Sequence, residues 1–158
     1  MSGPVATARC STETATLALG ERIGTRVEPG DLILLSGQLG AGKTVLVRGI
    51  AAGMGIDPAL VRSPTFVLHH IYRAEPKVLH HIDLYRLGSS ADIRLLDIDE
   101  MLESGGVVVV EWGEHASREQ DAPARISIDI DADGSRLISL EAGGLQRLGD
   151  EWEEGVRR

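Results

Sequence analysis

The sequence predicts a three-layer α/β fold built on a mixed sheet, and three observations support this. An apolar run of strand length at 31–36 leads into a glycine-rich stretch and then into a helical segment at 45–52. Strand-like runs at 65–72 and 77–85 are separated by a turn too short for a parallel crossover, which predicts an antiparallel hairpin. The valines at 107–110 are apolar on both faces, as expected of a central strand.

The remaining segments fit around this sheet. A first helix is expected over 12–26, where a serine or threonine can cap the start and apolar residues recur at every fourth position. A helical region is expected over 90–103. Alternating residues at 125–130, a turn signal and an apolar return at 137–140 predict a second hairpin.

We expect a single domain at 1–142 and a loosely ordered C-terminal tail at 143–158. A chain of 158 residues is long enough for one proper hydrophobic core. The tail is charged and contains glycine without a clear apolar face, which is typical of a loosely held terminus.

Composition excludes several classes of protein. The formal net charge is −8 and the only lysines are Lys43 and Lys77, so no basic face for nucleic acid is expected; another chain would have to hold any RNA. The single cysteine, Cys10, fits a reducing compartment. No apolar run approaches membrane-spanning length and the first residues do not resemble a signal peptide, so we expect a cytoplasmic protein without membrane contact.

The glycine-rich stretch from Gly37 to Thr44 matches the phosphate-binding loop pattern G-x-x-x-x-G-K-[ST] in its usual strand–loop–helix context. Glycines let the backbone turn so that N–H groups point at a polyphosphate, and the helix N-terminus adds partial positive charge. Lys43 should reach the β and γ oxygens and support catalysis, and the Thr44 hydroxyl should bind Mg²⁺. The residues of this P-loop NTPase-like motif that we expect to contact the nucleotide are Gly37, Leu39, Gly40, Ala41, Gly42, Lys43 and Thr44.

Two carboxylates stand at the ends of predicted strands. Glu111 directly follows the four valines, at the sheet edge where proteins with such a loop hold Mg²⁺; the alternative is a solvated glutamate at a strand end. His81 and Asp83 alternate and therefore face one side of their strand. Asp83 could position an attacking water or complete the outer shell of the magnesium, or it could simply pair with Arg86 or a nearby histidine.

Other features leave two interpretations open. Ser63-Pro64-Thr65-Phe66 could sense a γ-phosphate as a switch segment does, or could be a loop that enters a strand. The doublets His69-His70 and His80-His81 suggest a metal cluster, but neighbours in a strand point to opposite faces. Trp112 could contact nucleotide or partner, or pack in the core.

Together these motifs resemble the TsaE family, also called YjeE, over residues 11–140. The resemblance is carried by 37–44, Ser63 to Phe66, the stretch from His81 to Arg86, and Glu111-Trp112, in this order and spacing. Members of that family are small bacterial ATPases needed for the threonylcarbamoyl modification of the adenosine beside the tRNA anticodon.

The resemblance implies cofactors, roles and partners. It implies ATP or ADP with Mg²⁺ held by Thr44 and Glu111, hydrolysis supported by Asp83, and an adenine contact from the segment around Thr14. It also implies the TsaD and TsaB proteins as partners, with the transferase chemistry on TsaD and tRNA reached only through the complex.

Two other functions compete with a partner-dependent ATPase. A small-molecule kinase could use the same loop, although such a kinase usually carries a lid with arginines, and 113–123 contains only Arg118. A nucleotide-gated binding module could use ATP to set its conformation. Phosphate release with water as the only acceptor separates the three.

Overall fold

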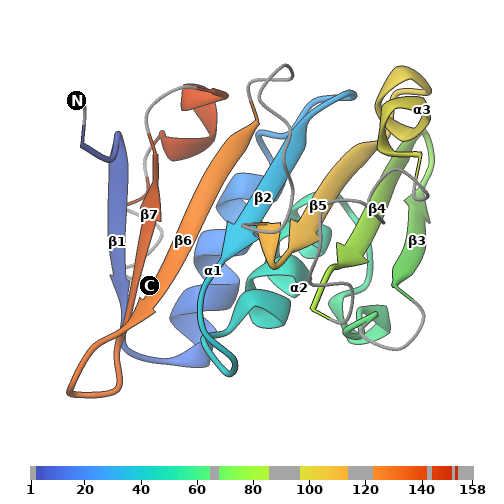
Figure 1. Ribbon diagram of the computed structural model, residues 1–158. Coiled ribbons are helices and arrows are strands. Elements are labelled where there is room, and N and C mark those ends of the chain that lie inside the picture. Colours follow the sequence, from blue (N-terminus) through green and yellow to red (C-terminus); the bar gives the residue numbers. More distant parts are fainter. Residues whose placement is uncertain are drawn as a thin grey trace.

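The computed structural model describes residues 3–64, 68–85, 97–113, 123–141, 144–150 and 152. Within them, a mixed sheet is ordered β1-β7-β6-β2-β5-β4-β3 (Figure 1). Its strands are β1 (Ala6–Cys10), β2 (Leu32–Ser36), β3 (His69–Ala74), β4 (Lys77–Asp83), β5 (Val107–Glu111), β6 (Ala124–Ile130) and β7 (Arg136–Leu140). The helices are α1 (Glu13–Gly24), α2 (Lys43–Gly53) and α3 (Ile98–Glu103), with short 3-10 turns η1 (Pro58–Leu60) and η4 (Gln146–Gly149).

The centre of the sheet is parallel and its two sides are antiparallel. Strand β2 runs parallel to both β5 and β6, and β4 runs parallel to β5. The hairpins β3–β4 and β6–β7 are antiparallel, as the sequence predicts. The first hairpin is tighter than expected, because Ala74 and Lys77 are register partners and only two residues separate the strands.

Helices cover the two faces of the sheet and produce the predicted three layers. Alternate residues of the central strands, such as Ile33 and Val109, pack in the core beneath α1 and α2. The intervening residues, such as Leu34 and Val110, pack with Ile98 of α3 on the opposite face. The expected helical region at 90–103 is described only from residue 97 onward; the rest lies outside the described residues.

Glycines bring α1 and α2 into direct backbone contact. Gly20 and Gly24 of α1 face Gly49 and Gly53 of α2, and a Cβ atom added at Gly20 would lie 2.8 Å from the Cα of Gly49. No other residue type fits at that separation without moving backbone. The contact fixes where α1 begins relative to α2, and both N-termini lie at the same end of the sheet (Figure 1).

Two parts of the fold differ from the sequence expectation. Strand β1 was not expected; it is a short edge strand rich in small residues, and its place is set by pairing with β7. In the segment expected to be a loosely held tail, Leu148 and Trp152 are 0% and 2% exposed and belong to the core beneath the sheet. Isolated apolar residues in a charged stretch carry no periodicity, so this packing depends on tertiary contacts.

Within the described residues, no helix is both long enough and apolar enough to cross a membrane.

Candidate functional site

The glycine-rich loop connects the buried strand β2 to the start of α2. Its turns use the left-handed region of backbone space at Gly40 (φ 81°) and Gly42 (φ 105°), where a side chain would be strained. Gly42 is the N-cap residue of α2, and Lys43 is the first helical residue. The strand–loop–helix context expected from the sequence is therefore confirmed.

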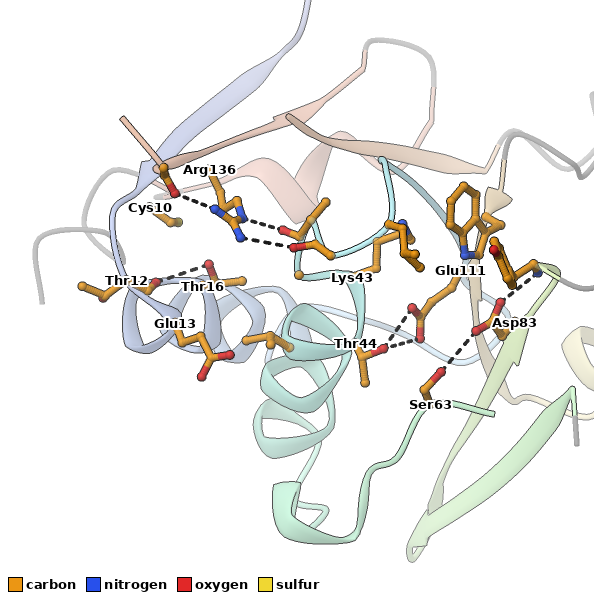
Figure 2. A pocket seen from close by; sticks show the side chains of 18 of the residues that line it. Cys10, Thr12, Glu13, Thr16, Lys43, Thr44, Ser63, Asp83, Glu111 and Arg136 are labelled. Carbon is orange, nitrogen blue, oxygen red and sulfur yellow. Dashed lines mark hydrogen bonds between the residues drawn. The ribbon is translucent and has the colours of Figure 1, made fainter. Parts of the chain in front are cut away.

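A cleft of about 430 Å³ lies over this loop. The loop residues from Leu39 to Thr44 line it, whereas Gly37 lies outside the lining and contributes its carbonyl to Lys43. Asp83 and Glu111 border one end of the cleft, and the start of α1 borders the other (Figure 2). Trp112 also lines the cleft. The arrangement suits an elongated ligand with an anionic group over the loop.

Lys43 points into the loop and away from the hydrophobic core. Its Nζ donates to the carbonyls of Gly37 (2.5 Å) and Gln38 (3.1 Å), and it lies 3.9 Å from the centroid of the Trp112 ring. The side chain is only 5% exposed. A buried ammonium held by carbonyl oxygens at the loop is well placed for a phosphate oxygen, which is a stronger acceptor.

Thr44 and Glu111 meet although 67 residues separate them in the sequence. The Thr44 hydroxyl lies 3.0 Å from each oxygen of the Glu111 carboxylate. Glu111 is 3% exposed, which is inconsistent with a solvated glutamate at a strand end. A hydroxyl and a buried carboxylate at the carboxyl end of parallel strands are oxygen donors of the kind that Mg²⁺ prefers.

Asp83 is the register partner of Glu111 on the neighbouring strand β4. It is 2% exposed; its Oδ2 accepts from the Ser63 hydroxyl (3.2 Å) and its Oδ1 from the Tyr85 amide (2.8 Å). Asp83 therefore joins the segment that follows η1 to the end of β4. The alternative pairing with Arg86 concerns a residue outside the described ones, as do Thr65 and Phe66 of the switch-like motif.

The histidine doublets divide between the two faces of the sheet. His69 Nε2 and His80 Nδ1 lie 2.9 Å apart with stacked rings on one face, where burial lowers the pKa of both imidazoles. His81 lies on the other face and reaches Glu111. Among the described residues, no group of three histidine, cysteine or carboxylate side chains could hold a metal ion.

The start of α1 borders the cleft through the neighbours of Thr14. Thr14 itself is exposed and does not line the cleft, whereas Thr12, Glu13 and Thr16 do. Cys10 lines the same end, and burial raises the pKa of its thiol. An adenine contact from this segment would therefore come from the residues flanking Thr14.

Comparison with known proteins decides the family. The family model described as "Threonylcarbamoyl adenosine biosynthesis protein TsaE" matches residues 10–138. The chain belongs to the TsaE family. The match covers almost the whole range that the sequence motifs indicated, and it confirms the resemblance.

TsaE relatives are similar over most of their length. The protein named tRNA threonylcarbamoyladenosine biosynthesis protein TsaE in Treponema pallidum is 38% identical over 84% of this chain and 98% of its own. That of Streptomyces coelicolor is 40% identical over 85% and 91%. The crystal structure of Bacillus subtilis YdiB superposes with a TM-score of 0.67 at 27% identity, over 96% of this chain and 93% of that one.

One residue of this TsaE cleft escaped the sequence analysis. Arg136, at the start of β7, donates from Nε to the carbonyl of Ala41 (2.9 Å), from Nη2 to that of Gly40 (3.2 Å) and from Nη1 to that of Gly134 (2.5 Å). It thus clamps the backbone of the glycine-rich loop from the opposite side of the cleft to Glu111 (Figure 2). No local motif surrounds it, and only the β6–β7 register brings it to the loop.

Proposed function

We propose that this TsaE protein binds and hydrolyses ATP with Mg²⁺, and that it acts with the TsaD and TsaB proteins in tRNA threonylcarbamoyladenosine biosynthesis. One observation supports the proposal above the others. Lys43, Thr44, Asp83 and Glu111 come from three different parts of the chain and converge at one end of a cleft over a glycine-rich loop.

The nucleotide would place its phosphates over the loop. Lys43 would exchange a carbonyl partner for the β and γ oxygens, and the N-terminus of α2 would face the same anion. The base and ribose would extend toward the start of α1, where Thr12, Glu13 and Thr16 line the cleft. ADP would occupy the same positions after hydrolysis.

Thr44 and Glu111 fit a magnesium ion. Both offer oxygen to one small space, and Glu111 is buried with a hydroxyl and an imidazole as its described hydrogen-bond partners. When bound, Mg²⁺ supplies positive charge to the transferring phosphoryl group. Thr44 and Glu111 would hold the ion, and phosphate oxygens and water would supply its other ligands.

Asp83 would orient the attacking water. It lies beside Glu111 in the sheet register, and its Ser63 contact extends toward the switch-like segment. A change in the bound phosphate groups would therefore alter the surroundings of Ser63. That segment and the surface near Trp112 would form a partner-facing rim.

The composition favours action within a complex. A net charge of −8 disfavours direct tRNA binding, so the partners would hold the tRNA. Arg136 is the one arginine among the described residues that line the cleft. Its hydrogen bonds go to backbone carbonyls at the end of the cleft away from Asp83. We therefore expect a partner to supply an arginine that stimulates hydrolysis. We also expect the protein to act in the cytoplasm, where the tRNA is.

Phosphate release with water as the only acceptor tests the proposal. We expect slow hydrolysis by the chain alone and a large rise with TsaD and TsaB, since an arginine supplied in trans is worth roughly 10³ to 10⁵ in rate. Asp83→Asn should abolish the rise while ATP still binds, and it keeps an acceptor for the Tyr85 amide. Lys43→Ala should lose tight ATP binding with the fold intact.

Two outcomes would contradict this reading. Full turnover by the isolated chain, indifferent to both proteins, would favour the small-molecule kinase. Nucleotide binding that changes partner affinity without phosphate release, in the presence of Mg²⁺, would favour the nucleotide-gated module.

A further inference from the structure

A buried histidine contacts the carboxylate assigned to magnesium. His81 lies within β4, is 0% exposed, and its Nε2 is 2.5 Å from Oε2 of Glu111. The contact joins two residues 30 positions apart, one on each of two adjacent parallel strands. The functions assigned above to the loop, Asp83 and Glu111 make no use of this imidazole.

The two nitrogens of the His81 ring have different surroundings. The carboxylate of Glu111 can only accept, so the hydrogen at this contact belongs to His81 Nε2. Nδ1 is buried and has no hydrogen-bond partner within the described part of the chain. Nε2 is therefore the ring nitrogen whose hydrogen bond ties His81 to its surroundings, and its partner is Glu111.

The contact restricts how Glu111 can turn. One oxygen, Oε2, accepts from both His81 and Thr44, whereas Oε1 accepts from Thr44. A glutamate at a strand end has three side-chain torsions, and a buried N–H donor that fixes one oxygen leaves the carboxylate plane with little freedom. Residues that orient a metal ligand in this way commonly contribute 10–100-fold to metal affinity.

We propose that His81 is a positioning residue, which aims the Glu111 carboxylate at the metal position beside Thr44 through its Nε2–H. The inference rests on the proposed magnesium-dependent nucleotide binding and deepens it. His81 does not line the cleft. Its role is carried through Glu111, and a histidine that merely filled the core would not need its donor on Nε2.

Two amide variants of His81 distinguish a role in orienting Glu111 from a role in core packing alone. In His81→Gln the amide nitrogen falls near the place of Nε2 and can still donate to Glu111. In His81→Asn it falls near the place of Nδ1, where no described partner lies. Calorimetry should measure ADP binding across a magnesium titration, and ADP binding without magnesium, for both variants and the wild type.

We expect His81→Gln to retain the apparent magnesium affinity within a few fold and His81→Asn to lose about 10–100-fold. Binding of ADP without magnesium should be equal in all three proteins. Equal magnesium affinity in the two variants would overturn the positioning role alone. A wild type whose ADP binding ignores magnesium would instead overturn the magnesium part of the proposed function, and the positioning role with it.

A spectroscopic measurement keeps the inference testable if either variant fails to fold. Nitrogen NMR of the wild-type protein, labelled at histidine, should show His81 with a hydrogen on Nε2. Glu111→Gln should move the Nε2–H resonance, because a neutral amide replaces the charged acceptor. A protonated Nδ1 with a bare Nε2, or a resonance that ignores Glu111→Gln, would overturn the proposal.

Discussion

Arg136 shows how a distant side chain can shape a loop that it does not belong to. Its guanidinium group can only donate hydrogen bonds, and it donates to the carbonyls of Gly40, Ala41 and Gly134. In a trans peptide the N–H and C=O groups point in opposite directions, so a carbonyl held by Arg136 turns the next amide away from it. Because Arg136 holds the Ala41 carbonyl, the Gly42 N–H of the same peptide unit points away from Arg136.

We therefore predict that Arg136→Lys weakens ADP binding about tenfold, which corresponds to about 1.4 kcal/mol. Lysine retains the charge but lacks the planar fork that holds two carbonyls together. Calorimetry measures the effect, and Arg73→Lys, at an exposed arginine of β3 that does not line the cleft, is the control. Wild-type affinity in Arg136→Lys would mean that the loop keeps its shape without the clamp.

The site residues differ in how far the sequence revealed them. Lys43 and Thr44 belong to a contiguous motif, and Glu111 and Asp83 stand at strand ends, where parallel topology alone predicts convergence. Arg136 has no such marker, because its contact with Ala41 spans 95 residues and depends on the register of β6 with β7. His81 was visible as a strand histidine, but its partner depends on the β4–β5 register.

The contact between α1 and α2 is made by backbone against backbone. The spacing of four residues between Gly20 and Gly24, and again between Gly49 and Gly53, places each pair on one face of its helix. This spacing can be seen in the sequence alone. The periodic apolar residues predicted α1, but such periodicity does not determine the distance between two packed helices.

We predict that Gly49→Ala destabilises the protein by about 1–3 kcal/mol, as an overpacked core does. Its Cβ would meet the Leu17 carbonyl and lie 2.8 Å from the Cα of Gly20, so backbone must move. This outcome reverses the gain of about 1 kcal/mol that alanine normally brings to a helix. Urea unfolding measures it, with Gly3→Ala as control because no atom lies within 4 Å of that site. An unchanged or raised stability would show that the helices separate without cost.

Residues near both ends of the described chain belong to the hydrophobic core. Strand β1 borders β7 at one edge of the sheet, and Gly149 packs against Ala6 so closely that an added Cβ would lie 2.8 Å from the Ala6 Cβ. Trp152 follows and belongs to the core beneath the sheet. The central strands and hairpins were predictable from apolar runs, whereas these terminal contacts are made by isolated residues without a pattern.

Trp152→Ala should accordingly lower the free energy of unfolding by about 3–5 kcal/mol, the usual cost of removing a buried large aromatic side chain. Trp152→Phe should lose less, because it keeps most of the ring and gives up the indole N–H that donates to the Leu148 carbonyl. Thermal and urea unfolding compare the two variants. A loss below about 0.5 kcal/mol for the alanine variant would place the segment back among loosely held termini.

The hydrogen bonds of Lys43 affect the residence time of a bound ligand. Its ammonium is held by the carbonyls of Gly37 and Gln38 and lies over the face of Trp112. A phosphate that recruits this lysine therefore replaces existing partners, and the net gain is the difference between two good sets of contacts. When the phosphate departs, the lysine has acceptors to return to. Such a balance favours a short residence time and rapid exchange of the proposed nucleotide.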